Sequence, residues 1–262
     1  MNEVWVKSWN DLLDILYAGA WSPTLQRYRS PFAFRGVSDR GYRLETTLRR
    51  LGGDFVKVEP HLLRNFRKYA HRDVVEGDTI WHWLSVAQHH GLPTRLLDWT
   101  YSPFVALHFA TANLNKFELD GVVWMVNFVE VHRHLPDLLR LELDSLGAHA
   151  FDVEMLSARL ASLASLDTIC PTPFALFFEP PSLDDRIVNQ FALFSILSSP
   201  TAVLEDWLQA IKVTCSKVII PAGLKWEIRD KLDQANITER VLFPGLDGLS
   251  TWLKRHYSPK VG

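Results

Sequence analysis

Residues 85–110 read SVAQHHGLPTRLLDWTYSPFVALHFA and combine a polar centre with two apolar ends. The thirteen positions from 88 to 100 hold seven polar or titratable side chains, namely Gln88, His89, His90, Thr94, Arg95, Asp98 and Thr100. A buried polar group without a partner costs roughly 1–3 kcal/mol. These side chains must therefore bind one another, water or a ligand, and the stretch predicts a functional site between two helices.

The flanking patterns predict helices interspersed with strands. An apolar stripe predicts a helix over residues 58–73, Asp78 fits the start of a helix that runs to about His90, and Ser102-Pro103 opens a helix through Ala110. Strands are expected at residues 31–36, 121–128, 174–178, 189–197 and 217–220, and residues 94–100 are expected to form a loop. Because these elements show no regular βαβ order, we expect an α+β fold with a mixed central sheet flanked by helices.

Composition indicates one domain with a proper core. The chain has 262 residues, of which 47% are hydrophobic, and its net charge of −2 argues against binding nucleic acid through bulk charge. Residues 131–167 are expected to be helical and best fit an insertion. Neither a signal peptide nor a membrane-spanning run is apparent, and Cys170 and Cys215 suit a reducing compartment, so we expect a cytoplasmic protein without membrane contact.

Arg35 and Gly36 end the strand predicted over residues 31–36. Arginine presents a planar set of donors that suits phosphate or carboxylate, and glycine lets a ligand or another backbone come close. We therefore expect Arg35 to bind an anion, with Gly36 beside it. The structural alternative is an ion pair between Arg35 and an acid such as Asp98.

The polar stretch supplies the other candidates. We take His89, His90 and Asp98 as candidate catalytic groups, and Gln88, Thr94, Arg95, Trp99 and Thr100 as candidate ligand-binding groups. Successive helical residues point about 100° apart, so Gln88, His89 and His90 cannot all face one site. One of the two histidines is expected to lie at the helix C-terminus, where a cation is favoured. The structural alternative for Arg95 and Asp98 is that they pin the loop.

Gln190 is a further catalytic candidate. It lies in the strand predicted over residues 189–197, where alternation places it on the same face as Ala192 and Phe194. An amide among apolar neighbours needs a partner, which is either a ligand or a neighbouring loop.

These segments together resemble the FRG family, which is named for a Phe-Arg-Gly triplet. The triplet is Phe34-Arg35-Gly36, and the resemblance continues through QHHGLPTRLLDWT (88–100), RIVNQ (186–190) with Phe194, and LFPGL (242–246). The four blocks occur in one order and cover most of the chain. The resemblance therefore implies a single FRG-type domain over residues 1–262.

The order of these groups is also similar to that in ADP-ribosyltransferases of the arginine–serine–glutamate type. There, a first-strand arginine binds NAD, a Ser-Thr-Ser strand shapes the nicotinamide pocket, and a late glutamate holds the ribose. The resemblance implies that Arg35 takes the place of the NAD-binding arginine. It places Asp98-Trp99-Thr100 near the Ser-Thr-Ser strand and Gln190 near the late glutamate, and it implies a split sheet. The Ser-Thr-Ser triplet is absent and Gln190 is an amide, which affects catalysis more than binding.

Three functions follow from these observations. The first is an ADP-ribosyltransferase-like enzyme that takes NAD as substrate and transfers ADP-ribose to a protein, a nucleic acid or water, as a toxin or in phage defence. In it, His89 or His90 moves a proton and Trp99 stacks on a ring. The second is a catalytically silent nucleotide-binding or interaction module. The third is a metal-dependent hydrolase or nuclease, but His82, His89 and His90 lack a known metal-binding spacing, and we expect no metal.

Overall fold

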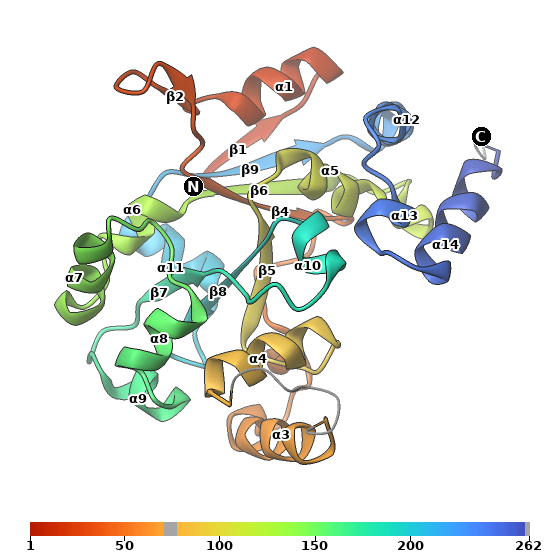
Figure 1. The fold of residues 1–262 in the computed structure, drawn as a ribbon. Helices are drawn as coiled ribbons and strands as arrows, with labels where there is room; N and C mark the ends of the chain where they lie inside the picture. Colours follow the sequence, from red (N-terminus) through yellow and green to blue (C-terminus); the bar gives the residue numbers. More distant parts are fainter. Residues whose placement is uncertain (71–77, 260–262) are drawn as a thin grey trace.

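The computed structural model describes residues 1–70 and 78–259, and its centre is a seven-stranded sheet (Figure 1). The strand order is β1-β9-β6-β4-β5-β8-β7, in which β1 and β9 pair in parallel and the other neighbours are antiparallel. The strands are β1 (Asn2–Trp5), β4 (Phe32–Val37), β5 (Leu96–Thr100), β6 (Gly121–Asn127), β7 (Ala175–Phe178), β8 (Ala192–Leu197) and β9 (Cys215–Ile220). A separate hairpin pairs β2 (Trp21–Ser22) with β3 (Arg27–Tyr28). The predicted α+β class with a mixed sheet is confirmed.

The junction between β4 and β5 is the shortest in this sheet. β4 pairs with β6 along its whole length, from Phe32 to Val37, whereas β4 and β5 share the single residue pair Phe34↔Thr100. The seven strands nevertheless belong to one sheet, so a split sheet of the ADP-ribosyltransferase type is not confirmed. The short junction leaves room for side chains between the two strands.

Two groups of helices cover one face of the sheet. Phe34 and Thr100 oppose each other directly and so point to this face from the two halves of the sheet. The first group, α1 (Trp9–Tyr17), α5 (Pro103–Thr111) and α12 (Lys225–Gln234), packs on β9, β6 and β4. The second group, α3 (Phe55–Ala70), α4 (Ile80–His89), α7 (Asp137–Leu146), α8 (Val153–Arg159) and α9 (Leu163–Thr168), packs on β5, β8 and β7.

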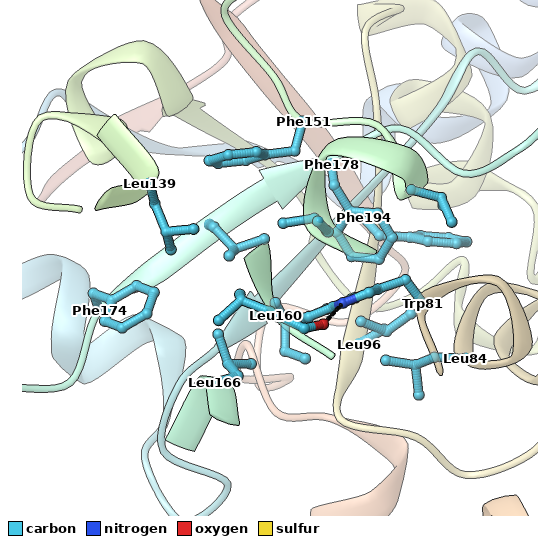
Figure 2. Close-up of a cluster of buried hydrophobic side chains, with 14 of the residues drawn as sticks. Trp81, Leu84, Leu96, Leu139, Phe151, Leu160, Leu166, Phe174, Phe178 and Phe194 are labelled. Atoms are coloured by element: carbon cyan, nitrogen blue, oxygen red, sulfur yellow. Dashed lines mark hydrogen bonds between the residues drawn. The ribbon is translucent and has the colours of Figure 1, made fainter. Parts of the chain in front are cut away.

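The core of the second group is rich in aromatic rings (Figure 2). Trp81 of α4 is fully buried, and its indole nitrogen donates to the Leu160 carbonyl at 2.7 Å. Its ring meets Phe178 of β7 edge-on, and Phe178 meets Phe194 of β8 in the same way. This core ties α4, which ends in the polar stretch, firmly to the sheet.

The opposite face is covered by α6 (Phe128–His132) and α11 (Leu204–Ile211). Trp99 and Trp124 are buried on this side. The other helical segments are short or peripheral: α2 (Thr47–Arg50), η1 (Leu114–Lys116), α10 (Asp185–Asn189), η2 (Ala222–Leu224), α13 (Glu239–Leu242) and α14 (Leu246–His256). Within the described residues, no helix is long and apolar enough to cross a membrane.

Two secondary-structure predictions are wrong. The loop expected over residues 94–100 contains β5, whose Leu96, Leu97 and Trp99 are buried in the middle of the sheet. The single exposed residue of β5, Asp98, interrupts an otherwise buried run, so the sequence shows no alternation that marks a strand. The strand expected over residues 189–197 begins only at Ala192, because Asp184 caps the short helix α10 in front of it and Gln190 ends that helix.

The other predicted elements are found, although Thr79 and not Asp78 caps α4. Residues 131–167 are largely helical, through the end of α6 and through α7, α8 and α9, and side chains of the last three share a core with α4 and β5. The helix predicted over residues 58–73 is α3, whose predicted end falls outside the described residues. Single-domain organisation stays a prediction.

Candidate functional site

A cavity of about 230 Å³ opens where β4 and β5 separate. Its walls come from β4, the end of α4, β5, α5, α10 and β8. Eight of the eleven residues predicted for the site line it: Arg35, Gly36, Gln88, His89, Asp98, Trp99, Thr100 and Gln190. The cavity also has apolar walls and a second arginine that were not among the predicted site residues, namely Phe34, Phe109, Arg186, Ile187, Ala192 and Phe194.

Arg35 bridges the gap between the two strands. Its Nη1 donates to the Asp98 carbonyl at 2.6 Å and lies 3.6 Å from the Asp98 carboxylate. Its Nε is buried and has no hydrogen-bond partner among the described residues. Burial lowers the pKa of the Arg35 guanidinium, and the Asp98 carboxylate partly offsets this effect. An arginine remains protonated despite such a shift, so the cavity holds a cation that has a buried donor without a partner among the described residues.

Arg186 brings a second guanidinium to the same cavity from α10. Its Nη1 donates to the His89 carbonyl at 3.3 Å, and the group lies 5.0 Å from the ring centre of Phe243. The Nε of Arg186 is also buried without a partner among the described residues. The cavity therefore contains two cations, each with a buried donor that no described protein group satisfies.

Asp98 supplies the negative charge near this site. Its side chain is 58% exposed. The Gln88 amide nitrogen donates to both carboxylate oxygens, at 2.8 and 2.9 Å. The Thr94 hydroxyl in turn donates to the Gln88 oxygen and accepts from the Leu96 amide. Thr94 is thus buried behind the cavity and fixes the amide orientation of Gln88, while Gln88 holds Asp98.

His89 lines the cavity at the end of α4 and is paired with Asp184. Its Nε2 lies 2.8 Å from a carboxylate oxygen of Asp184, whose other oxygen accepts from the Ile187 amide and caps α10. Burial lowers the pKa of His89, and Arg186 adds to this, while Asp184 opposes it. His89 is therefore neutral at neutral pH, and the pair joins α4 to α10.

Gln190 and Thr100 link the cavity to the C-terminal region. The Gln190 amide nitrogen donates to the Leu242 carbonyl at 2.9 Å, and the Thr100 hydroxyl donates to the Gln190 carbonyl at 2.7 Å. Leu242 belongs to the segment at residues 242–246 that was noted in the sequence. One N–H of the Gln190 amide is thus engaged by the protein, and its side-chain oxygen can accept a bond from a ligand.

Gly36 has a packing role in addition to its place in the cavity wall. A Cβ built at this position would lie 1.8 Å from the Ala106 carbonyl oxygen and 2.7 Å from the Ala110 nitrogen, both in α5. Only glycine lets α5 approach β4 so closely. This contact places Phe109 of α5 against the cavity.

The structure places three other predicted residues elsewhere. Arg95 is buried, with Nε 2.7 Å from the Glu59 carboxylate and Nη1 2.5 Å from that of Asp167. Its guanidinium joins α3 to α9, and these carboxylates hold its pKa above the ordinary value although burial lowers it. His90 is exposed and does not border the cavity. Thr94 acts through Gln88, as described above.

Trp99 borders the cavity, but its ring points to the opposite face of the sheet. The indole nitrogen donates to the Ser195 hydroxyl at 2.8 Å, and the ring centre lies 5.4 Å from that of Phe177. In this position the ring cannot stack on a ligand in the cavity. Phe34, Phe109 and Phe194 provide the aromatic surface instead.

Arg35 was among the predicted site residues, whereas Arg186 was not. The signal was the run Arg186–Gln190, in which an arginine stands four residues before a candidate site residue. Across residues 1–70 and 78–259, no three His, Cys, Asp or Glu side chains gather so that they could hold a metal ion. The histidine-based hydrolase or nuclease therefore lacks a set of ligands in this part of the chain.

The sequence profile of the FRG domain matches residues 30–119, which include Arg35, Gln88, His89 and Asp98. Searches of curated proteins and of solved structures found no significant match. The chain therefore contains an FRG domain over residues 30–119, and this domain supplies β4, α4 and β5 of the cavity.

Proposed function

We propose that the cavity binds NAD and that the protein cleaves it at the nicotinamide–ribose bond, transferring ADP-ribose to a macromolecule or to water. The observation that carries this proposal is the pair of arginines. Arg35 and Arg186 come from separate elements, line one cavity, and each keep a buried Nε without a partner among the described residues. An unsatisfied buried donor costs roughly 1–3 kcal/mol, so the protein leaves both guanidinium groups incompletely satisfied, and an anion that accepts from the two groups would be stabilised.

A phosphate group is the anion that best fits two guanidinium groups. Arginine binds phosphate through parallel donors, and such charge-assisted bonds are about twice as strong as neutral ones. Asp98 would repel an anion at its own position, but 58% of its side chain faces solvent. A ligand that joins a phosphate to a hydroxyl-bearing group suits this charge arrangement, because the carboxylate accepts bonds from hydroxyls.

The size of the cavity favours partial enclosure of a dinucleotide. Its volume of about 230 Å³ lies below the range of roughly 300–1,000 Å³ that is usual for small-molecule sites. The enclosed part would be one ring and ribose with an adjoining phosphate, and the remainder would extend past the edge. Phe34, Phe109 and Phe194 offer an apolar surface for the ring.

Asp98 can supply the negative charge that Gln190 lacks. Cleavage of the nicotinamide–ribose bond develops positive charge on the ribose, and a fixed carboxylate stabilises this charge. Gln88 holds both oxygens of Asp98, so the carboxylate is already oriented. Gln190 would then accept a bond from a ribose hydroxyl through its free oxygen. Loss of NAD or modification of a macromolecule would make such a protein a toxin or a phage-defence effector.

A catalytically silent nucleotide-binding module is the second candidate. The amide of Gln190, at the place where the similar transferases have a glutamate, favours it. The two proposals share the ligand and differ in whether NAD is consumed.

Nicotinamide release from NAD by the purified protein, with and without cell lysate as a source of acceptor, tests the proposal. We expect release by the wild type and by Arg140→Ala, which removes an arginine on α7 that does not line the cavity, and a loss of at least a hundredfold in Arg35→Ala and Arg186→Ala. Binding of NAD without release would support the silent module. Neither binding nor release would refute both candidates.

A further inference from the structure

The pair formed by His89 and Asp184 has the geometry of an oriented acid–base group. The His89 side chain is only 8% exposed, and its Nε2 lies 2.8 Å from Asp184 Oδ2. Asp184 Oδ1 accepts from the Ile187 amide at 3.1 Å and thereby caps α10. Because both carboxylate oxygens are engaged, the carboxylate is held in place against the imidazole.

This arrangement sets the tautomer of His89. An ionised carboxylate can only accept hydrogen bonds, so the proton of the neutral imidazole sits on Nε2. The Asp184 carboxylate is ionised, since the bonds from Ile187 and His89 lower its pKa although burial opposes them. Nδ1 then carries the lone pair, and it has no hydrogen-bond partner among the described residues. The ring itself lines the cavity.

The charged groups around the ring act in opposite directions on the pKa of His89. Asp184 favours the imidazolium, whereas Arg186 on α10 and the neighbouring His90 disfavour it. Arg186 also donates to the His89 carbonyl at 3.3 Å, which joins the same two helices. The resting histidine is neutral, and an anionic partner stands ready to stabilise the cation that forms when it takes up a proton.

We propose that His89 is the proton acceptor of this cavity and that Asp184 positions it. The role rests on the NAD cleavage proposed above. A water or acceptor hydroxyl oxygen forms a bond to the ribose carbon, and the bond from that carbon to the nicotinamide nitrogen breaks. The electron pair of that bond neutralises the nicotinamide ring, and the proton of the attacking group passes to His89 Nδ1. Asp184 then stabilises the imidazolium across the 2.8 Å contact.

Asp184→Asn tests this role with almost no change of shape. Asparagine is as good a helix cap as aspartate, and its oxygen must face the Ile187 amide, since only an oxygen can accept that bond. Its NH2 group therefore faces His89 Nε2 and donates to it, which moves the imidazole proton to Nδ1. The hydrogen bond stays, but the atom that should accept the proton now carries one.

We expect Asp184→Asn to keep its melting temperature and NAD affinity and to lose at least a hundredfold in turnover, the lower end of what general-base catalysis contributes. In the wild type, turnover should decline on the acid side only below pH 6.5, because burial lowers the pKa of His89. In Asp184→Asn this acid-side decline should disappear. Asp152→Asn is the matched control. Asp152 caps α8 by accepting from the Met155 amide at 2.7 Å, and its substitution should leave turnover unchanged.

Nitrogen NMR of the His89 ring gives a readout that needs no turnover. We expect the Nε2–H tautomer in the wild type and the Nδ1–H tautomer in Asp184→Asn. Turnover of Asp184→Asn within twofold of wild type, or an Nδ1–H tautomer in the wild type, would overturn the role of the pair. If the wild type released no nicotinamide, NAD cleavage would fail, and the ring spectrum alone would decide whether Asp184 orients His89.

Discussion

Replacing Arg35 by alanine, in comparison with the same change at Arg95, separates an arginine that is available to a ligand from one that holds the fold. The two residues have similar side-chain burial, at 17% and 5% exposure, but different surroundings. Arg35 donates to one carbonyl, of Asp98, and keeps an unpartnered Nε within the described residues. Arg95 is saturated by two carboxylates.

The expected effects on stability differ accordingly. Arg35→Ala removes a charged hydrogen bond worth about 1.5–3 kcal/mol, and it also removes the orphaned Nε, which costs about 1–3 kcal/mol. These contributions nearly cancel, so the free energy of unfolding should change by less than about 1 kcal/mol. Arg95→Ala leaves Glu59, which is 2% exposed, as an unpaired buried charge. Breaking such a pair costs about 3–5 kcal/mol, which corresponds to a drop in Tm of roughly 10 °C.

The expected effects on NAD binding run the opposite way. Loss of Arg35 removes one or two charge-assisted bonds to phosphate, for a total of about 3 kcal/mol, which weakens the Kd roughly a hundredfold. Thermal unfolding and calorimetric titration with NAD measure both quantities on the same samples. If Arg35→Ala lowered Tm by as much as Arg95→Ala and still bound NAD normally, Arg35 would be structural and the site would lie elsewhere.

Two further changes test the close packing at Gly36 and the buried histidines of the fold. Gly36→Ala should lower the free energy of unfolding by about 3 kcal/mol, because the new Cβ would lie 1.8 Å from the Ala106 carbonyl oxygen and α5 would have to move. A urea titration measures this change, and unchanged stability would contradict the close packing. Burial, aided at His108 by the charge of a neighbouring arginine, lowers the pKa of His108 to about 3 and of His132 to about 4, both from 6.5. The two imidazoles resist protonation only in the folded state, so their contribution to the free energy of unfolding is fully present above pH 6.5. Below pH 6.5 the free energy of unfolding falls by at most about 1.4 kcal/mol per pH unit for each histidine. Urea titrations at pH 7.5, 6 and 5 check this, and equal stability at all three would refute it.

The sequence located much of the candidate site because polar groups stand out against apolar surroundings. Gln88, His89 and Asp98 were singled out on that basis, and all of them line the cavity. The roles of individual residues were harder to predict. Arg35 and Arg95 are chemically identical, and only the distant carboxylates of residues 59 and 167, which folding brings to Arg95, tell them apart.

The errors in secondary structure have a related cause. β5 is five residues long, and Asp98 within it and Arg95 before it gave its surroundings the composition of a loop. Asp184 was not taken as a helix cap, since α10 has only five residues and shows no apolar stripe. Gln190 nevertheless reaches the cavity, because it ends α10 beside β8. Short elements carry too little pattern to be predicted without their tertiary contacts.

The most direct test of phosphate binding at this site is a crystal structure of the protein with ADP-ribose. We predict that phosphate oxygens lie within about 3.2 Å of a guanidinium nitrogen of Arg35 and of one of Arg186, with a ribose hydroxyl against the carboxylate of Asp98. An ADP-ribose bound at another surface, with this cavity unoccupied, would contradict the assignment of the nucleotide site.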